Sequence, residues 1–313
     1  MLKAAWECVN GSIVPLAARA ATVLGNRQSS AFRDAMDLRA IDMIEFSRLM
    51  AGLFGFLCLA ASPAFAATPS DLYQAQAIVT GTGEVNRQIG FKECLDKVLV
   101  KVSGDQRLTQ KPEMLAMRDK AGHFVQSFRY HDRLQGIPIH DEQGTHDRPH
   151  DLTCLYKPAV VDKLLAQLGS RPWPGERPLL AVFMTAEQGQ RHFVLTADEN
   201  QGATMRESFA NATVPLLMRI TFPKASQFGG LDEKALAAAD MTKLDQLAKK
   251  AGAARALAGS IVWSDKELGW IADWRLANHG KTYRWQVRGV SFDEAFRVAM
   301  RGAAQILSGN GQP

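Results

Sequence analysis

The polar segment 131–151 contains the side chains best suited to metal chemistry. It holds four histidines and five carboxylates: His131, His140, His146 and His150 with Asp132, Asp141, Glu142, Asp147 and Asp151. Imidazole and carboxylate groups bind zinc and copper, and the spacing of His146 and His150 would place both on one face of a helix. Gly144 and Pro149 oppose a helix there, so we interpret the segment as a polar loop. His140, His146 and His150 are weak candidates for a metal site, and we expect no cofactor.

Other patterns that carry chemistry are incomplete. Gly81-Thr82-Gly83 stands between a predicted strand and a predicted helix, as a phosphate-binding turn does, but Asn86 replaces the third glycine of a dinucleotide fingerprint. The serines lack a Gly-x-Ser-x-Gly context, and no spacing of carboxylates singles out an acid–base pair. We therefore expect a non-enzymatic protein, with a metal-dependent hydrolase that uses the loop 131–151 as the alternative.

Three predicted strands near the end of the chain carry a row of aromatic residues. Apolar and polar residues alternate over 257–263, 270–276 and 283–287, which is typical of antiparallel strands with one buried face. The aromatic side chains share that face: Trp263, Trp270, Trp274, Tyr283 and Trp285. We interpret them as core residues rather than a sugar- or peptide-stacking platform, because the helix predicted after the cap Ser291 has an apolar face to cover them.

Arginines alternate onto the opposite face of the same strands. Arg275, Arg284 and Arg288 would lie on this solvated face. A cluster of guanidinium groups suits an acidic partner or phospholipid head groups, whereas a simple solvated face is the plainer interpretation. We keep these three residues as a possible partner face.

The segment Met43–Ala66 has the pattern of a secretory signal peptide. Arg48 supplies a short basic region, Leu49–Ala61 is an apolar stretch of about a dozen residues, and Ala64-Phe65-Ala66 fits a small-x-small cleavage site. The stretch is too short to span a bilayer, which needs roughly 20 apolar residues. We therefore expect export to the periplasm, cleavage after Ala66 and no transmembrane span in the mature chain.

Residues 1–42 precede this segment and show no sustained apolar period. We interpret them as an unstructured or non-native extension, with Met43 as the true initiator. Cys58 follows two large apolar residues, which disfavours lipidation. The mature chain keeps 31 basic and 27 acidic residues, a net charge of +4, spread without a basic stripe. We therefore expect no nucleic-acid partner.

Two cysteines, Cys94 and Cys154, remain in the mature chain. The first lies in a helical pattern and the second in a strand pattern, so both can face one core. An even pair in an oxidising compartment favours a disulfide, and closing a loop of about 60 residues would stabilise the fold by roughly 3–4 kcal/mol on the chain-entropy model. Two buried free thiols are the alternative.

Periodicity divides the mature chain into two small α+β domains. The first, 70–168, has strand patterns at 73–79, 124–130 and 152–156, and helical patterns at 85–103, 112–120 and 159–168. The segment 169–178 has three prolines and two glycines, so it forms a linker, and we expect Trp173 to pack against one domain.

The second domain, 179–307, begins with a hairpin around Gly189. Helical patterns follow at 204–217, 233–239 and 242–251, and the three aromatic strands and the last helix complete the domain. We expect this domain to be an antiparallel meander covered by helices.

These segments together resemble a family of bacterial periplasmic proteins, the domain of unknown function 2066 family. The resemblance follows the signal peptide and is carried by Asp71-Leu72-Tyr73, CLDKVLVKVSGD at 94–105, FVQSFRY at 124–130, LTCLYKPAVVDKLLAQLG at 152–169, RPWPGERPLLAVF at 171–183 and the block 252–285. It covers nearly all of the mature chain, and VLVKVSG with WPGERPLLAVF is its most distinctive part. The family carries no established activity, so the resemblance implies a location and transfers no functional residue. The C-terminal half is also loosely similar to small α/β domains of envelope-assembly proteins.

From these observations we expect an exported, non-enzymatic cell-envelope factor. It would bind a protein partner through sheet edges or through the arginine-bearing face. A small-ligand binder, with its pocket between the two domains, is a further alternative.

Overall fold

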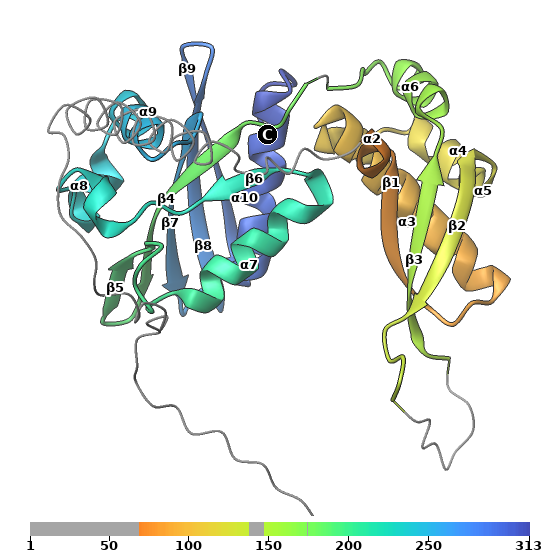
Figure 1. Ribbon diagram of the computed structural model, residues 1–313, viewed down its shortest axis with the longest axis horizontal. Helices are drawn as coiled ribbons and strands as arrows, with labels where there is room; N and C mark the ends of the chain where they lie inside the picture. Colours follow the sequence, from red (N-terminus) through yellow and green to blue (C-terminus); the bar gives the residue numbers. More distant parts are fainter. Residues whose placement is uncertain (1–68, 138–146, 174) are drawn as a thin grey trace, which may run out of the picture. The chain divides into compact units, whose positions relative to one another are not determined.

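The computed structural model describes residues 69–137, 147–173 and 175–313. All of them belong to the compact unit Phe65–Pro313. They form a three-stranded sheet and a six-stranded sheet, each packed with helices, which confirms the expected α+β class (Figure 1). The predicted signal segment Met43–Ala66, the extension 1–42 and Cys58 lie outside the described residues.

The three-stranded sheet has the order β1-β3-β2, and both pairings are antiparallel. The elements of this part are α2 (Pro69–Leu72), β1 (Gln74–Thr80), α3 (Glu84–Ser103), the 3-10 helix η1 (Gln106–Gln110), α4 (Glu113–Asp119), α5 (Ala121–Phe124), β2 (Val125–Asp132), β3 (Pro149–Tyr156) and α6 (Pro158–Gln167). Helix α3 packs along one face because its apolar residues recur every three or four positions and are buried against the strands. It ends, as predicted, at Gly104, which has a left-handed φ of 73°.

The loop within the polar segment 131–151 is shorter than the sequence predicted. Strand β2 continues to Asp132 and β3 begins at Pro149, and the ladder pairs Asp132 with His150. Polar side chains do not prevent this pairing, because the ladder is made by backbone groups. The predicted loop was therefore wrong at both of its ends, since the prediction depended on side-chain polarity.

The six-stranded sheet has the order β5-β4-β7-β8-β9, with β6 beside β4. Its part of the chain comprises β4 (Leu179–Gln188), β5 (Arg191–Val194), α7 (Ala203–Thr213), the 3-10 helix η2 (Val214–Leu216), β6 (Arg219–Thr221), the 3-10 helix η3 (Ala225–Phe228), α8 (Glu233–Ala238), α9 (Met241–Lys250), β7 (Arg255–Ser264), β8 (Gly269–Asn278), β9 (Lys281–Val290) and α10 (Phe292–Leu307). The predicted antiparallel meander is confirmed as β7-β8-β9, and the predicted hairpin as β4-β5. The sequence did not predict that β4 pairs in parallel with both β6 and β7.

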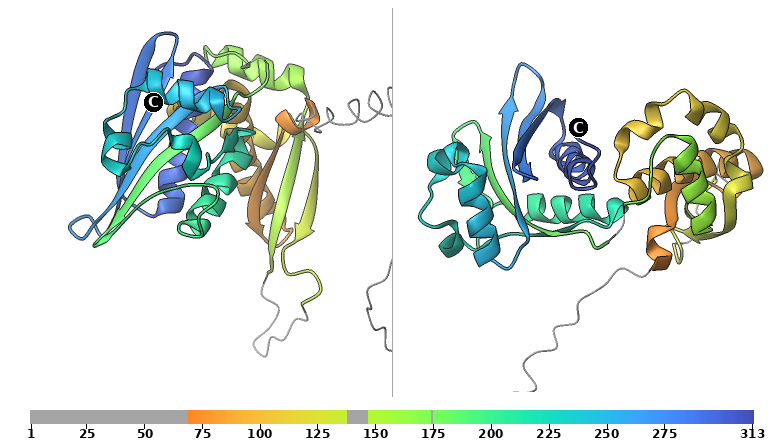
Figure 2. Two further views of the ribbon diagram at one scale, coloured as in Figure 1. Left: turned by 60° about the vertical axis from the view of Figure 1, so that its left-hand side comes forward. Right: turned by 90° about the horizontal axis from the view of Figure 1, so that it is seen from above.

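Helices cover both faces of the sheet at β4 and β7. Helices α7 and α10 lie on one side, and α8 and α9 lie on the other (Figure 2). Along β4, Val182 and Met184 face the first layer, whereas Ala181 and Phe183 face the second. A strand buried on both faces reads as a continuous apolar run. Ala256 and Ala258 of β7 are buried in the second layer as well, so the expectation of a wet face on the meander was wrong for β7.

The aromatic residues of the meander are core residues, as predicted. Trp274 is fully buried, Trp270 and Trp285 are buried, and Trp263 and Tyr283 pack at the margin of the same core. Helix α10 covers them with its apolar side. The helix starts at the predicted cap, where the Ser291 hydroxyl accepts a hydrogen bond from the backbone N–H of Glu294 at 3.2 Å.

The predicted linker 169–178 helps to cap the carboxyl end of α3. The last four carbonyl groups of this helix each accept a hydrogen bond: Val100 from the Gly104 N–H, Lys101 from Arg177, Val102 from the Trp173 N–H, and Ser103 from the Asn310 side chain. The Arg177 guanidinium also stacks on Trp173, 4.2 Å from its ring centre. Trp173 packs against the core of the six-stranded sheet, as expected. The linker thus satisfies helix carbonyls that would otherwise lack partners.

Candidate functional site

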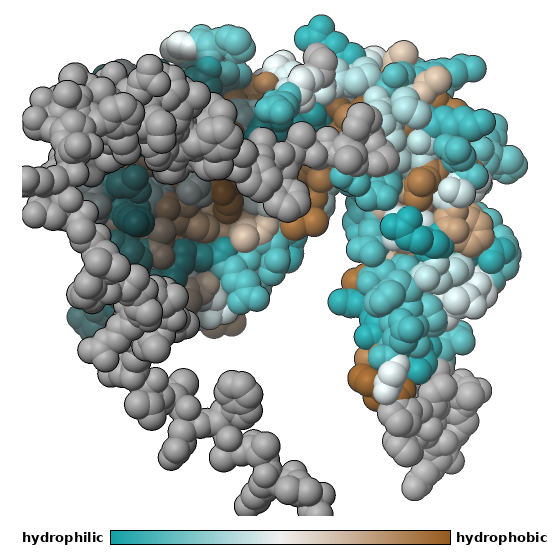
Figure 3. Space-filling model, in the orientation of Figure 1, coloured by the Kyte–Doolittle hydropathy of each residue, from teal (hydrophilic) through white to brown (hydrophobic). Residues whose placement is uncertain are grey.

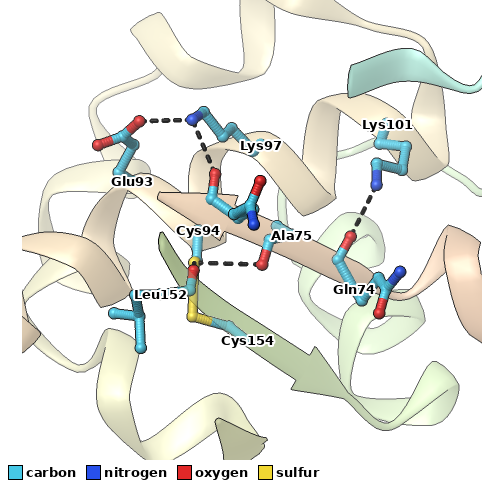
Figure 4. Close-up of a disulfide and its surroundings, with 9 residues drawn as sticks. Gln74, Ala75, Glu93, Cys94, Lys97, Lys101, Leu152 and Cys154 are labelled. Atoms are coloured by element: carbon cyan, nitrogen blue, oxygen red, sulfur yellow. Dashed lines mark hydrogen bonds and ion pairs between the residues drawn. A yellow bond between two sulfur atoms is a disulfide. The ribbon is translucent and has the colours of Figure 1, made fainter. Parts of the chain in front are cut away.

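The structure joins Cys94 and Cys154 in a disulfide, the pairing that the sequence favoured over two free thiols. The bond connects α3 to the central strand β3 across a separation of 60 residues, with Cα atoms 6.3 Å apart (Figure 4). Both cysteines are fully buried. The Cys94 sulfur lies 3.5 Å from the carbonyl oxygen of Ala75, within the core. This burial is typical of a structural crosslink rather than of a reactive thiol pair.

The histidines of the segment 131–151 are not brought together where the structure describes them. His140 and His146 lie outside the described residues. His150 faces α3, with its Nδ1 atom 2.7 Å from the carbonyl oxygen of Arg148, whereas His131 projects to the other face of the sheet. The described ranges contain no group of three or more His, Cys, Asp or Glu side chains that could hold a metal ion. A metal site in this segment stays a hypothesis.

The three arginines of the possible partner face lie in different environments. Arg275 is partly buried and donates to two carbonyl groups at the end of α8, at 2.9 and 3.4 Å. Burial lowers its pKa, and the neighbouring Arg284 lowers it further. Arg288 pairs with Glu267 at 3.1 Å. Arg284 is exposed and makes no side-chain contact of this kind with the described residues. These residues therefore do not form one free cationic face.

The turn Gly81-Thr82-Gly83 joins β1 to α3, as predicted. Gly81 has a φ of 70°, and a Cβ atom on it would lie 2.6 Å from the carboxyl carbon of Asp147. A carboxylate so close to the turn repels a phosphate group. The structure therefore favours a simple strand-to-helix turn at this position.

The face of the three-stranded sheet opposite α3 is open and polar. The register places its side chains in rows across β1, β3 and β2: Gln74, Leu155 and Ser127; Gln76, Thr153 and Arg129; Ile78, Asp151 and His131. In Figure 3 the residues over this part of the molecule are mainly hydrophilic, with single hydrophobic residues among them. Antiparallel sheets commonly leave one face open in this way.

A cavity of about 490 Å³ lies on this open face. Strand residues line it together with Lys97 and Lys101 of α3 and with Val214, Pro215 and Leu217. Leu217 has a left-handed φ of 53°. Its lining contains four cationic groups and two carboxylates: Lys97, Lys101, Arg129, Arg133, Asp71 and Asp151. The excess of cations makes the cavity suitable for an anion.

Two lysines of α3 reach the edge of β1 from one side of the cavity (Figure 4). Lys97 and Lys101 are four residues apart, so they lie one above the other on the helix. Their ammonium groups donate to the carbonyl oxygens of Gln76 and Gln74, each at 2.8 Å. Both lysines thereby cover backbone groups of an edge strand that would otherwise be open to another chain.

Lys101 is the most buried cation of the cavity. It is only 8 % exposed, and burial lowers its pKa to about 8. The nearby charges of Arg177 and Lys97 also lower this pKa, while the charge of Asp71 opposes the shift. Lys101 is therefore mostly protonated at pH 7 but loses its proton in mildly alkaline solution.

Arg129 is the cation of the cavity with the most unused hydrogen-bonding capacity. It is exposed on β2, directly across from Thr153. Its guanidinium makes no ion pair or hydrogen bond with another side chain in the part of the chain that the structure describes. By contrast, Arg133 lies 3.6 Å from Asp151. Arg129 therefore offers five free donors to a ligand.

Sequence reasoning missed this cavity. The spacing of Lys97 and Lys101 was visible, and so was the alternation of Arg129 with Phe128 and Tyr130. The missing information was the strand order β1-β3-β2, which brings residues from 71 to 153 onto one face. Strand order depends on pairing between distant segments and leaves no local pattern.

Comparison with known protein families finds a match to one part of the chain. A family model described as "Domain of unknown function (DUF8605)" matches residues 66–174, which include the three-stranded sheet and its helices. No curated protein and no solved structure matches the chain. The resemblance to the domain of unknown function 2066 family stays a prediction. Among the helices of the described residues, none has the length and apolar character needed to cross a membrane.

Proposed function

We propose that the protein is an exported, non-enzymatic factor of the cell envelope that binds a protein partner. The buried crosslink between Cys94 and Cys154 carries this proposal, because disulfides persist in oxidising compartments and are rare in reducing ones. The signal-like segment Met43–Ala66 and the resemblance to a periplasmic family support the same compartment.

Binding rather than catalysis is supported by the kind of surface that the open sheet face offers. It carries cations, amides and hydroxyl groups arranged in rows. The competing hypothesis, a metal-dependent hydrolase, would need ligands from the segment 131–151. The opposite orientations of His131 and His150 disfavour it. A small-ligand binder remains the other alternative.

Cell fractionation combined with mass spectrometry of the amino-terminal peptide tests the export. We expect the chain in the periplasmic fraction, with Ala67 as its first residue. The variant Leu57→Arg should stay uncleaved, because a charge in the apolar stretch costs about 3 kcal/mol on membrane insertion. Leu57→Met is the matched control and should be exported. Soluble cytoplasmic protein that keeps its leader would contradict the proposal.

Crosslinking in intact cells tests the partner. We expect a protein neighbour that crosslinks through the described surface of the mature chain. Hydrolytic activity that depends on an added divalent metal, and is lost when His150 is changed to alanine, would favour the hydrolase instead.

A further inference from the structure

We infer that the cavity on the open face of the three-stranded sheet binds an acidic, partly apolar peptide segment of the partner. This inference deepens the proposed function. It rests on that function in one respect, because it takes the partner to be a protein. Three features of the cavity carry it: its charge, the distance between its cations and its apolar wall.

The charge of the cavity favours an anionic ligand. Of its two carboxylates, Asp151 already faces Arg133 at 3.6 Å and His131 at 3.8 Å. Asp71 lies near Lys101, whose ammonium donates to the Asp71 carbonyl oxygen at 3.3 Å. Arg129 has no such neighbour among the described side chains. Lys97 is paired with Glu93, which does not line the cavity, at 2.5 Å. A carboxylate that enters the cavity therefore meets Arg129 as the cation whose charge no described acidic side chain balances.

The distance between the cations favours several carboxylates over a single phosphate. Lys97 lies at the outer edge of β1, where it donates to Gln76, and Arg129 lies in the same row on β2. Two strand spacings separate β1 from β2, which amounts to about 10 Å. One phosphate group cannot accept hydrogen bonds from both sides across that distance. An extended peptide presents alternate side chains about 7 Å apart, so two or three acidic residues cover the row.

Exposed apolar side chains in the same cavity indicate that the ligand is not purely acidic. Ile78 projects from β1 with 55 % of its surface exposed, and Val214 of η2 is 65 % exposed. Large exposed hydrophobic residues beside polar ones are typical of protein-binding surfaces. Pro215 and Leu217 extend this apolar wall. A peptide that alternates acidic and apolar residues satisfies both kinds of lining.

The six-stranded sheet does not offer an equivalent site. Of its three candidate arginines, Arg275 caps α8 and Arg288 is paired with Glu267. Arg284 resembles Arg129 in exposure and in its free guanidinium, but it is not among the residues that line the cavity. It therefore provides a matched control.

Peptide binding to the full chain, measured by fluorescence anisotropy, tests the inference. The probe is an acetylated, amidated hexapeptide that alternates glutamate with valine, carrying a fluorophore. We expect saturable binding whose Kd rises about tenfold in Arg129→Gln and about fivefold in Lys97→Gln, because each variant loses one charge contact. Arg284→Gln should leave Kd within about twofold of the wild type. Circular dichroism checks that each variant is folded.

Two further probes test the class of ligand. The same peptide with glutamine in place of glutamate should bind at least about tenfold more weakly. Added salt should weaken the binding of the acidic peptide. Inorganic phosphate at the peptide's concentration should not displace the peptide. Equal binding of both peptides, complete displacement by phosphate, or equal losses in Arg129→Gln and Arg284→Gln would each overturn the inference.

Failure of this inference is distinguishable from failure of the proposed function. If the peptide does not bind while partner crosslinks persist in cells expressing Arg129→Gln, the site is wrong and the proposed function stands. If the chain is cytoplasmic with its leader intact, the proposed function fails, whatever the peptide measurement gives.

Discussion

At the scale of single residues, Gly259 and Trp274 form a tightly packed pair in the larger sheet. They lie opposite each other on β7 and β8, and the indole of Trp274 occupies the space above the glycine. A Cβ atom on Gly259 would lie 2.2 Å from the Trp274 ring. Glycine in the middle of this strand is therefore explained by close packing rather than by a turn.

Changing Gly259 to alanine should destabilise the protein through overpacking. We expect Gly259→Ala to lower the free energy of unfolding by about 1–3 kcal/mol. Trp274→Ala alone should cost about 3–5 kcal/mol, because a fully buried indole is lost. In the Trp274→Ala background the ring is gone, so the added cost of Gly259→Ala should largely vanish. Urea denaturation of the wild type, the two single variants and the double variant measures these free energies of unfolding. Equal costs in both backgrounds would refute the packing explanation.

The buried ammonium of Lys101 should make stability depend on pH. Its pKa is lowered from 10.5 to about 8 by burial, with Arg177 and Lys97 adding to the shift and Asp71 opposing it. Between these two values the unfolded chain holds the proton that the folded chain has released. Stability should therefore rise with pH in this window, by at most about 3 kcal/mol.

The comparison with Lys101→Met isolates this contribution. From pH 8 to pH 10.5 the wild type should gain stability relative to the variant, because methionine carries no proton to release. Lys92→Met removes an exposed lysine of the same helix and should follow the wild type. Denaturant midpoints at a series of pH values give the difference. A constant difference between wild type and Lys101→Met across the window would contradict the expected shift.

At the scale of elements, the carboxyl end of α3 is held by segments far from it in sequence. Arg177 is 7 % exposed and donates to the carbonyl oxygens of Lys101, Trp173 and Gly175. A lysine keeps the charge but cannot reproduce this fork or the stacking on Trp173. We expect Arg177→Lys to lower the free energy of unfolding by about 2–3 kcal/mol. Arg284→Lys, on an exposed strand position, should stay within about 0.5 kcal/mol. Similar values for the two variants would show that the cap contributes little.

The local patterns that predicted elements correctly are those with strong periodicity or capping. Helix α3 ends at Gly104, α10 begins after Ser291, and the meander β7-β8-β9 carries its tryptophans inward. Each depends on residues close together in the chain. The parallel pairing of β4 with β7 was missed, because the two strands are separated by the whole segment between them.

The candidate site was predicted less well than the fold. The histidines of 131–151 were candidate metal ligands only because of their residue type. The part of that segment that the structure describes lies partly in β2 and β3. Arg275 was placed on a wet face, because α8 was not known to cover it. The cations at Lys97, Lys101 and Arg129 converge only through strand order. Which side chains meet is thus a property of tertiary pairing.

At the scale of the whole described molecule, α3 links the disulfide to the contacts with the rest of the chain. Cys94, near its middle, is bonded to Cys154. Its last carbonyl groups are held by Arg177, Trp173 and Asn310. A change in the stability of α3 should therefore also change the stability of elements beyond the three-stranded sheet.

Removal of the crosslink tests this coupling. A wild-type chain that begins at Ala67 should show about zero free thiols when titrated unreduced in denaturant. The double variant Cys94→Ala/Cys154→Ala should lose about 2–5 kcal/mol of stability, because the unfolded chain regains the freedom of a loop that spans 60 residues. Four tryptophans lie in the six-stranded sheet, at Trp263, Trp270, Trp274 and Trp285. Tryptophan fluorescence therefore reports mainly on that sheet, and far-ultraviolet circular dichroism on all elements.

We expect the denaturant midpoints from fluorescence and from circular dichroism to fall together in the double variant. The reason is that α3 cannot unfold without releasing the carbonyl contacts that hold the linker and Asn310. If the fluorescence midpoint stayed at its wild-type value while the circular dichroism signal showed an earlier transition, the two sheets would unfold independently. The cap on α3 would then be a local contact without influence on the larger sheet.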